Sequence, residues 1–109
     1  MENTTIKIKP LSINECFQGR RFKTIDYLIY EKTIWWLLPK LKIPKGKLKV
    51  YLEFGLSSKP ADIDNPVKPM VDILQKKYQF NDKQIYHMDL TKIDVKKGEE
   101  FISFLITAL

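Results

Sequence analysis

The sequence predicts a small α/β (α+β) domain, in which a mixed sheet of four to five strands packs against two helices. Residues 48–56 alternate between apolar and polar side chains, whereas residues 25–38 and 66–77 repeat their apolar side chains every three or four positions. Strand-like and helix-like segments therefore interleave along the chain. A length of 109 residues fits one domain, so we take residues 1–109 as a single domain.

The strands are predicted from alternation and composition. Four stretches qualify: residues 4–9, 48–56, 85–95 and 101–106. In the first stretch Ile6 and Ile8 share one face. The last two stretches are joined by a short turn at residues 97–99, so we expect them to pair as an antiparallel hairpin, which makes the sheet mixed. Residues 16–23, with a break at Gly19, could form a short ribbon or an ordered loop.

The first helix is expected over residues 25–38, with Thr24 or Asp26 available to cap its start. Within it, Trp35 and Trp36 are adjacent and therefore point in different directions. We assign them to the core and to a partner or helix-packing surface, in preference to base stacking.

The second helix is expected to open at Asn65-Pro66 and to end by about Lys77. Either Asp64 or Asn65 can cap it, and proline suits the first helical position. Its apolar stripe comprises Val67, Val71, Leu74 and Tyr78. This stripe predicts that the helix packs against the sheet.

The composition favours an anionic partner. Nineteen Lys and Arg stand against thirteen Asp and Glu, which gives a formal net charge of +6. Nucleic acid is the commonest partner of such a chain, although a Lys-rich solvated surface would give the same balance. The chain is 44% hydrophobic, enough for a core, and dimerisation would add the burial that one small domain lacks.

Several classes of protein are disfavoured by simple features of the sequence. Cys16 is the single cysteine, which excludes an intramolecular disulfide and a cysteine-type zinc site within one chain. The first residues lack the basic-then-apolar order of a secretory signal. No apolar run reaches the roughly 18 residues that span a bilayer. We therefore expect a soluble, intracellular protein without a membrane partner.

Three aspartates and one lysine surround the second helix of this basic chain: Asp62, Asp64, Asp82 and Lys68. In extended backbone the first two would point to the same side, next to the positive end of the helix dipole. A helix of about a dozen residues is ~18 Å long, so Asp82 must return along residues 79–81 to meet them or approach them from a neighbouring strand end. Clustered carboxylates repel a polyanion unless a divalent cation neutralises them.

Three hard oxygen ligands suit magnesium, or alternatively manganese. Such an ion lowers the pKa of a bound water and stabilises charge on a phosphodiester transition state. Lys68 could place its ammonium near that charge, orient a water, or pair with Asp72 four residues on. Taken singly, Asp64 could be a helix cap, Asp62 a solvated loop residue and Asp82 a turn residue.

The motif of residues 62–74, which runs Asp-Ile-Asp-Asn-Pro-Val-Lys-Pro-Met-Val-Asp-Ile-Leu, resembles the RusA family of Holliday-junction resolvases. The family pattern has Asp-x-Asp-Asn, a lysine four residues after the second Asp, then Asp-x-Leu, and later an acidic loop that residues 81–85 match. The segment from Pro10 to Asn14 resembles the family's N-terminal Pro-x-Ser-x-Asn. Together these matches cover most of the chain.

The resemblance implies a homodimeric, magnesium-dependent endodeoxyribonuclease of phage or prophage type. It would bind four-way DNA junctions and nick two strands symmetrically in DNA recombination and repair, in the cytoplasm of a bacterial cell or phage-infected host. By position, Asp62, Asp64 and Asp82 take the family's metal-binding and catalytic acidic roles, and Lys68 takes that of the catalytic lysine. The chain departs from the pattern at residues 58–61, where the family often has arginines, and at Asn81, which replaces a carboxylate.

Contacts to DNA phosphates are expected from the lysine of the acidic motif and from basic residues outside it, although each of the latter alone could be a solvated surface charge. The set comprises Arg20, Arg21, Lys40, Lys42, Lys45, Lys47, Lys59 and Lys68. His87, the single histidine, is interpreted as a strand residue because no second histidine or cysteine ligand accompanies it. Two alternatives to the nuclease remain: a DNA-junction binding protein without cleavage, and a structural or regulatory dimer without a DNA role.

Overall fold

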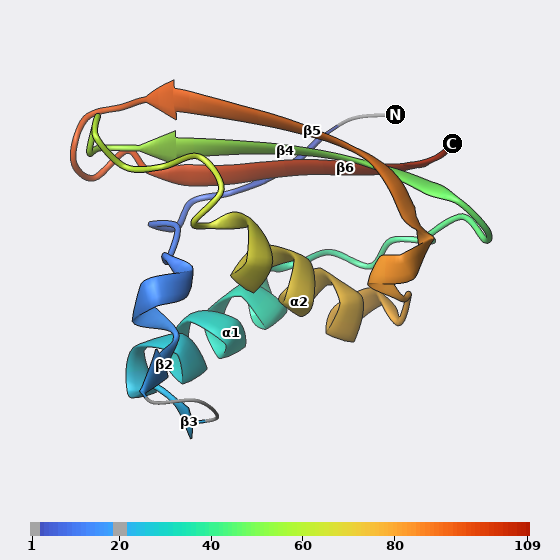
Figure 1. Ribbon diagram of the computed structural model, residues 1–109, viewed down its shortest axis with the longest axis horizontal. Coiled ribbons are helices and arrows are strands. Elements are labelled where there is room, and N and C mark those ends of the chain that lie inside the picture. Colours follow the sequence, from blue (N-terminus) through green and yellow to red (C-terminus); the bar gives the residue numbers. More distant parts are fainter. Residues whose placement is uncertain (1–2, 19–21) are drawn as a thin grey trace.

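The computed structural model describes residues 3–18 and 22–109, and Figure 1 shows them as a sheet with both helices on one of its faces. The sheet and the two helices comprise β1 (Thr4–Ile6), β4 (Leu48–Leu56), β5 (Ile85–Asp94), β6 (Phe101–Ala108), α1 (Ile25–Leu37) and α2 (Val67–Tyr78). The predicted α+β class, with a mixed sheet and two helices, is confirmed. Among the described residues, no helix has the length and apolar character needed to cross a membrane.

The strand order in the sheet is β1-β6-β4-β5. β4 pairs in parallel with β5 and antiparallel with β6, so the predicted hairpin between the last two strands is wrong. The connection from β4 through α2 to β5 explains the parallel pair, because a helical crossover returns the chain in the same direction. β6 is buried from Ile102 to Phe104, as suits an inner strand, whereas β5 is largely solvated, as suits an edge.

A second, smaller sheet pairs β2 (Phe17–Gln18) with β3 (Phe22–Lys23) in antiparallel fashion. The ribbon is therefore the correct one of the two predicted alternatives for this stretch. The predicted DNA contacts Arg20 and Arg21 lie outside the described residues. The described residues also include two short 3-10 helices, η1 (Ile13–Glu15) and η2 (Asp82–Gln84).

Thr24 caps α1, since its side-chain oxygen accepts a hydrogen bond from the Tyr27 N–H at 3.1 Å. The buried face of this helix repeats every three to four residues, through Tyr27, Tyr30 and Ile34. Trp35 falls outside that repeat and lies at the surface, with the Lys77 ammonium 4.8 Å from its ring centroid. Its assignment to the core is therefore wrong.

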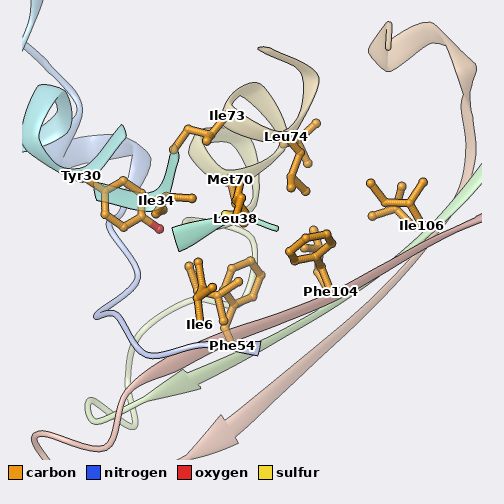
Figure 2. Packing of buried hydrophobic residues seen from close by; sticks show 14 of the residues in the cluster. Ile6, Tyr30, Ile34, Leu38, Phe54, Met70, Ile73, Leu74, Phe104 and Ile106 are labelled. Carbon is orange, nitrogen blue, oxygen red and sulfur yellow. The ribbon is translucent and has the colours of Figure 1, made fainter. Parts of the chain in front are cut away.

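The core lies between the helices and the inner face of the sheet, as Figure 2 shows in close-up. α2 contributes Met70, Ile73 and Leu74. Met70 and Leu74 point toward Phe54 and Phe104 from the two central strands, whereas Ile73 lies on the side of Ile34 of α1. Burial of each such side chain is worth about 1.5–3 kcal/mol. This packing fixes the orientation of α2 and therefore fixes which of its residues face away from the core.

Candidate functional site

A pocket of about 470 Å³ lies between α2 and the beginning of β5. Its polar lining comprises Asp64, Lys68, Asp82, Tyr86 and His87, and its apolar wall includes Val67, Val71 and Leu90. Three of the four predicted catalytic residues therefore share one pocket, although Asp82 lies fourteen or more residues from the other two along the chain.

Asp64 stands at the start of a turn that leads into α2. Its backbone carbonyl accepts a hydrogen bond from the Val67 N–H at 3.1 Å, and Pro66 occupies the cap position without a side-chain cap. The prediction that Asp64 or Asn65 caps the helix is therefore wrong. Within residues 3–18 and 22–109 the Asp64 carboxylate makes no hydrogen bond or ion pair, and it faces the pocket exposed.

Asp62 lines a different pocket, of about 260 Å³, together with Ser12, Glu15 and Asn65. The expectation that Asp62 and Asp64 point the same way assumed extended backbone, but residues 63–66 form turns that separate the two side chains. Over the part of the chain that the structure describes, no three His, Cys, Asp or Glu residues form a group that could hold a metal ion.

The N-terminal segment packs against the Asp64 turn. The Ile13 N–H donates to the Asn65 carbonyl oxygen at 2.9 Å, and Pro10 and Ser12 line the same pocket as Asp62. The two stretches that carry the motif, residues 10–14 and 62–66, are thus neighbours in space.

The loop that carries Asp82 is held in place by hydrogen bonds of its backbone. The Asp82 side chain is exposed at the pocket. The Asn81 side chain accepts from the Lys83 N–H at 2.9 Å, while Gln84 Oε1 accepts from the Asn81 N–H at 3.0 Å. This reciprocal pair is a capping box that starts η2. The amide at position 81, where the RusA-like pattern has a carboxylate, therefore has a local structural role.

Gln75 connects Asp82 to α2. Its Oε1 accepts from the Asp82 N–H at 2.8 Å, so the chain returns along the helix only as far as the level of Gln75. From Val67 to Gln75 the helix rises about 12 Å, at 1.5 Å per residue. Asp64 and Asp82 therefore lie toward opposite ends of the pocket.

Lys68 forms the predicted pair with Asp72, with Nζ 2.8 Å from Oδ1. The same Asp72 oxygen accepts from Gln75 Nε2 at 3.5 Å. An exposed pair of this kind adds at most about 1 kcal/mol of stability, so its main consequence is to hold the lysine head group in place. Lys68, Asp72 and Gln75 form one row on the solvent side of α2.

The loop before Asp62 is anchored from β5. The Lys92 ammonium donates to the carbonyl oxygen of Ala61 at 2.7 Å and also to that of Lys59. The side chain of Lys59, a predicted phosphate contact, is exposed. Lys92 thus fixes the backbone that leads into the acidic turn.

Sequence reasoning missed Gln75, Tyr86 and Lys92. For Gln75 a signal exists in the sequence, because it lies two helical turns after Lys68 and therefore on the same face. Lys92 and Tyr86 have none, since their positions depend on pairing between distant strands. His87 lies in a strand, as predicted, and also lines the pocket.

The single thiol does not belong to this site. Cys16 is buried, and its Sγ donates to the Ser12 carbonyl oxygen at 3.3 Å. Burial, aided by the negative charges of Glu15 and Asp72, raises the pKa of Cys16 to about 11. The thiol therefore stays protonated at neutral pH and is no nucleophile.

Neither a scan of the sequence against models of known protein families nor a search of curated proteins returns a match. The residues of the pocket and the motif of residues 62–74 are therefore the features that bear on function.

Proposed function

We propose that this protein is a metal-dependent endodeoxyribonuclease that resolves Holliday junctions or other branched DNA by paired, symmetric nicks in DNA recombination and repair. One observation carries the proposal: Asp64, Asp82 and Lys68 share a pocket in a chain of net charge +6. Neither carboxylate has a hydrogen-bond or ion-pair partner in the described parts of the chain. Unpaired carboxylates repel a bound polyanion unless a cation neutralises their charge.

The donor chemistry of the pocket fits magnesium, with manganese as the second candidate. Magnesium is usually held by one or two carboxylates, with waters and substrate phosphates as its other ligands. Asp64 and Asp82 are the residues that would hold it, but they lie toward opposite ends of the pocket, so one ion would contact both only after the loop that carries Asp82 moves toward Asp64. Asp62 joins them only if the turn at residues 63–66 rearranges on DNA binding. When bound, such an ion supplies an activated water and positive charge at the scissile phosphate.

Lys68 has a distinct role in this proposal. Its ammonium has three donors, and the contact with Asp72 uses one of them. The remaining donors are directed to solvent at the pocket, where they can bind a non-bridging phosphate oxygen. Asp72 acts through Lys68 by fixing its position, which makes it a positioning residue.

Paired nicks require two sites at a fixed distance, which a two-fold dimer provides. The outer face of α1 supports this part of the proposal, because it presents Ile25, Ile29 and Trp36 on one side of the helix. These side chains are 71%, 59% and 78% exposed, and a group of exposed apolar side chains on one face is typical of an interaction surface. We assign this face to a second copy of the chain.

A junction-binding protein without cleavage is the second candidate. It would share the basic surface and the dimer, but it would have no need for two unpaired carboxylates at the DNA. The pocket therefore favours the enzyme.

A synthetic four-way junction separates the candidates. The purified protein is incubated with the junction in Mg²⁺, Mn²⁺, Ca²⁺ or EDTA, and both binding and strand nicking are measured. The nuclease proposal predicts symmetric nicks with Mg²⁺ or Mn²⁺ and none with EDTA. Binding without nicking in every metal would support the second candidate, and absence of binding at low salt would exclude both.

A further inference from the structure

The pairing of β4 with β5 contains one irregularity, next to the pocket. Leu48 pairs with Ile85, but Lys49 pairs with His87, so Tyr86 has no opposite residue. Tyr86 is therefore the extra residue of a β-bulge. Bulges are frequent beside active sites, where they redirect a side chain that regular alternation would place elsewhere.

The bulge changes which side chains reach the pocket. In a regular strand only alternate residues share a face, yet Ile85, Tyr86, His87 and Met88 all line this pocket. The Tyr86 side chain is 63% exposed, whereas Tyr27 and Tyr30 are buried. An exposed aromatic ring thus lies at the rim of the pocket that holds Asp64 and Asp82.

Lys47 accompanies this ring. Its ammonium lies 4.8 Å from the Tyr86 ring centroid, within the range of a cation–π interaction. The backbone beside it is fixed at two points. The Gln84 side chain donates to the Gly46 carbonyl oxygen at 3.0 Å, and the Leu109 N–H donates to the Lys47 carbonyl oxygen at 3.0 Å.

We infer that Tyr86 and Lys47 form a subsite for an unstacked nucleobase and its phosphate, at the rim of the catalytic pocket. This inference rests on the proposed function and names what the site recognises in branched DNA. Aromatic rings bind bases of any sequence by stacking, and an adjacent cation binds the backbone. At a branch point the bases are more readily unstacked than in a continuous duplex. A base held on Tyr86 would direct the neighbouring phosphate toward Asp64 and Asp82.

The chain provides a matched control for this subsite. The Lys49 ammonium lies 4.7 Å from the Tyr51 ring centroid, which is a second lysine–tyrosine pair of nearly the same geometry. Tyr51 lines a different pocket, with Glu53 and Asp89. Its removal should therefore leave base stacking at the acidic pocket unchanged.

The test uses a four-way junction with 2-aminopurine at the branch point, in Ca²⁺, together with an unbranched duplex. Binding of the wild-type chain should quench the probe. Tyr86→Ala should abolish the quenching and weaken junction affinity about tenfold, in keeping with the usual contribution of one stacked base. Tyr86→Phe should retain both properties, Tyr51→Ala should match the wild type, and duplex affinity should be the same in all four proteins.

Two results would overturn the inference in different ways. Wild-type quenching and affinity in Tyr86→Ala, in a preparation that nicks junctions with Mg²⁺, would refute the subsite and leave the nuclease proposal intact. Absence of junction binding by the wild-type chain would refute both. A thermal melt of each variant checks folding, and Tyr86→Ala should melt like the wild type because the ring is exposed.

Discussion

The side-chain oxygen of Gln75 accepts a hydrogen bond from the backbone N–H of Asp82 at 2.8 Å. This bond holds the loop that follows α2 against the solvent face of the same helix. Through Asp72, Gln75 is also connected to Lys68, about 10 Å away along the helix at 1.5 Å per residue. The side chains at the two ends of the candidate pocket are therefore positioned by one row of residues.

Replacement of Gln75 should affect activity more than stability. Gln75→Ala removes the acceptor for the Asp82 N–H, which costs only about 1 kcal/mol of unfolding free energy but releases the Asp82 loop. We expect nicking of a junction to fall by about tenfold or more, by analogy with losses from small misplacements at active sites. The measurements are urea unfolding and the single-turnover nicking rate.

Gln75→Glu is the comparison variant, because it keeps an oxygen acceptor for the Asp82 N–H while it loses the donor to Asp72 and adds a negative charge beside that carboxylate. It should retain more activity than Gln75→Ala. Equal activity of the alanine variant and the wild type would show that the Asp82 loop needs no such support.

Lys68→Ala should slow the chemical step more than it weakens DNA binding. The ammonium is one charge among many for affinity, but it lines the pocket, where the proposed reaction would develop charge on the phosphate. Loss of one such group typically lowers the rate about 100-fold. Junction affinity and single-turnover rate are measured in parallel, with Lys97→Ala as control, because Lys97 is exposed in the turn between β5 and β6. An affinity loss as large as the rate loss would contradict the assigned role.

The stability of the fold should depend on pH through Glu31. This carboxylate accepts hydrogen bonds from Lys76 at 2.8 Å and Lys23 at 3.3 Å, and so joins α1 to α2 and β3. Burial acts to raise the pKa of Glu31, but the bonds from Lys76 and Lys23 outweigh it and hold the pKa below the usual 4.5. The folded state therefore binds this proton more weakly than the unfolded state does.

Because the pKa is lower in the folded state, the contribution of Glu31 is present above pH 4.5 and is lost as the pH falls through the lowered value. Glu31→Gln should cost about 1 kcal/mol of unfolding free energy at pH 7. In the same variant, the free energy of unfolding should fall less steeply as the pH decreases below 4.5. Urea unfolding across the pH range checks both effects, with the exposed Glu99→Gln as control, and identical pH profiles for Glu31→Gln and the wild type would refute the assignment.

Trp36→Glu should convert the proposed dimer into a monomer, because it places a charge in the apolar face of α1. Sedimentation analysis gives the mass, and junction cleavage should change from paired to single nicks. Leu41→Glu is the matched control, since Leu41 is also apolar and 42% exposed but lies in the segment between α1 and β4, outside the candidate pocket. A monomeric wild-type chain, or a dimeric Trp36→Glu variant, would contradict the assignment of this face.

Elements that depend on local periodicity could be predicted from the sequence. The bounds of β4 agree with the alternation of residues 48–56, and α1 begins after the predicted cap Thr24. Strand order could not be predicted in the same way. The chain turns at Gly98 between β5 and β6, yet β6 does not pair with β5 and lies on the opposite side of β4.

The candidate site was predictable in part. The sequence motif singles out Asp64, Lys68 and Asp82, and these three residues share one pocket. Asp62 does not line this pocket. The direction of its side chain depends on the turns at residues 63–66, and the prediction had assumed an extended backbone there. The bulge at Tyr86 depends on the register between two strands that are more than 30 residues apart, so no local pattern could have indicated it.

Junction nicking by aspartate variants is the most direct test of the pocket. Asp64→Asn and Asp82→Asn each keep the size of the side chain and remove one charge. Asp89→Asn is the control, because Asp89 is an exposed carboxylate on the same strand that begins beside Asp82, but it lines another pocket. Both pocket variants should bind a four-way junction at least as tightly as the wild type and should fail to nick it in Mg²⁺, whereas Asp89→Asn should nick normally. Full nicking by Asp64→Asn or Asp82→Asn would contradict the proposal that these carboxylates carry the reaction.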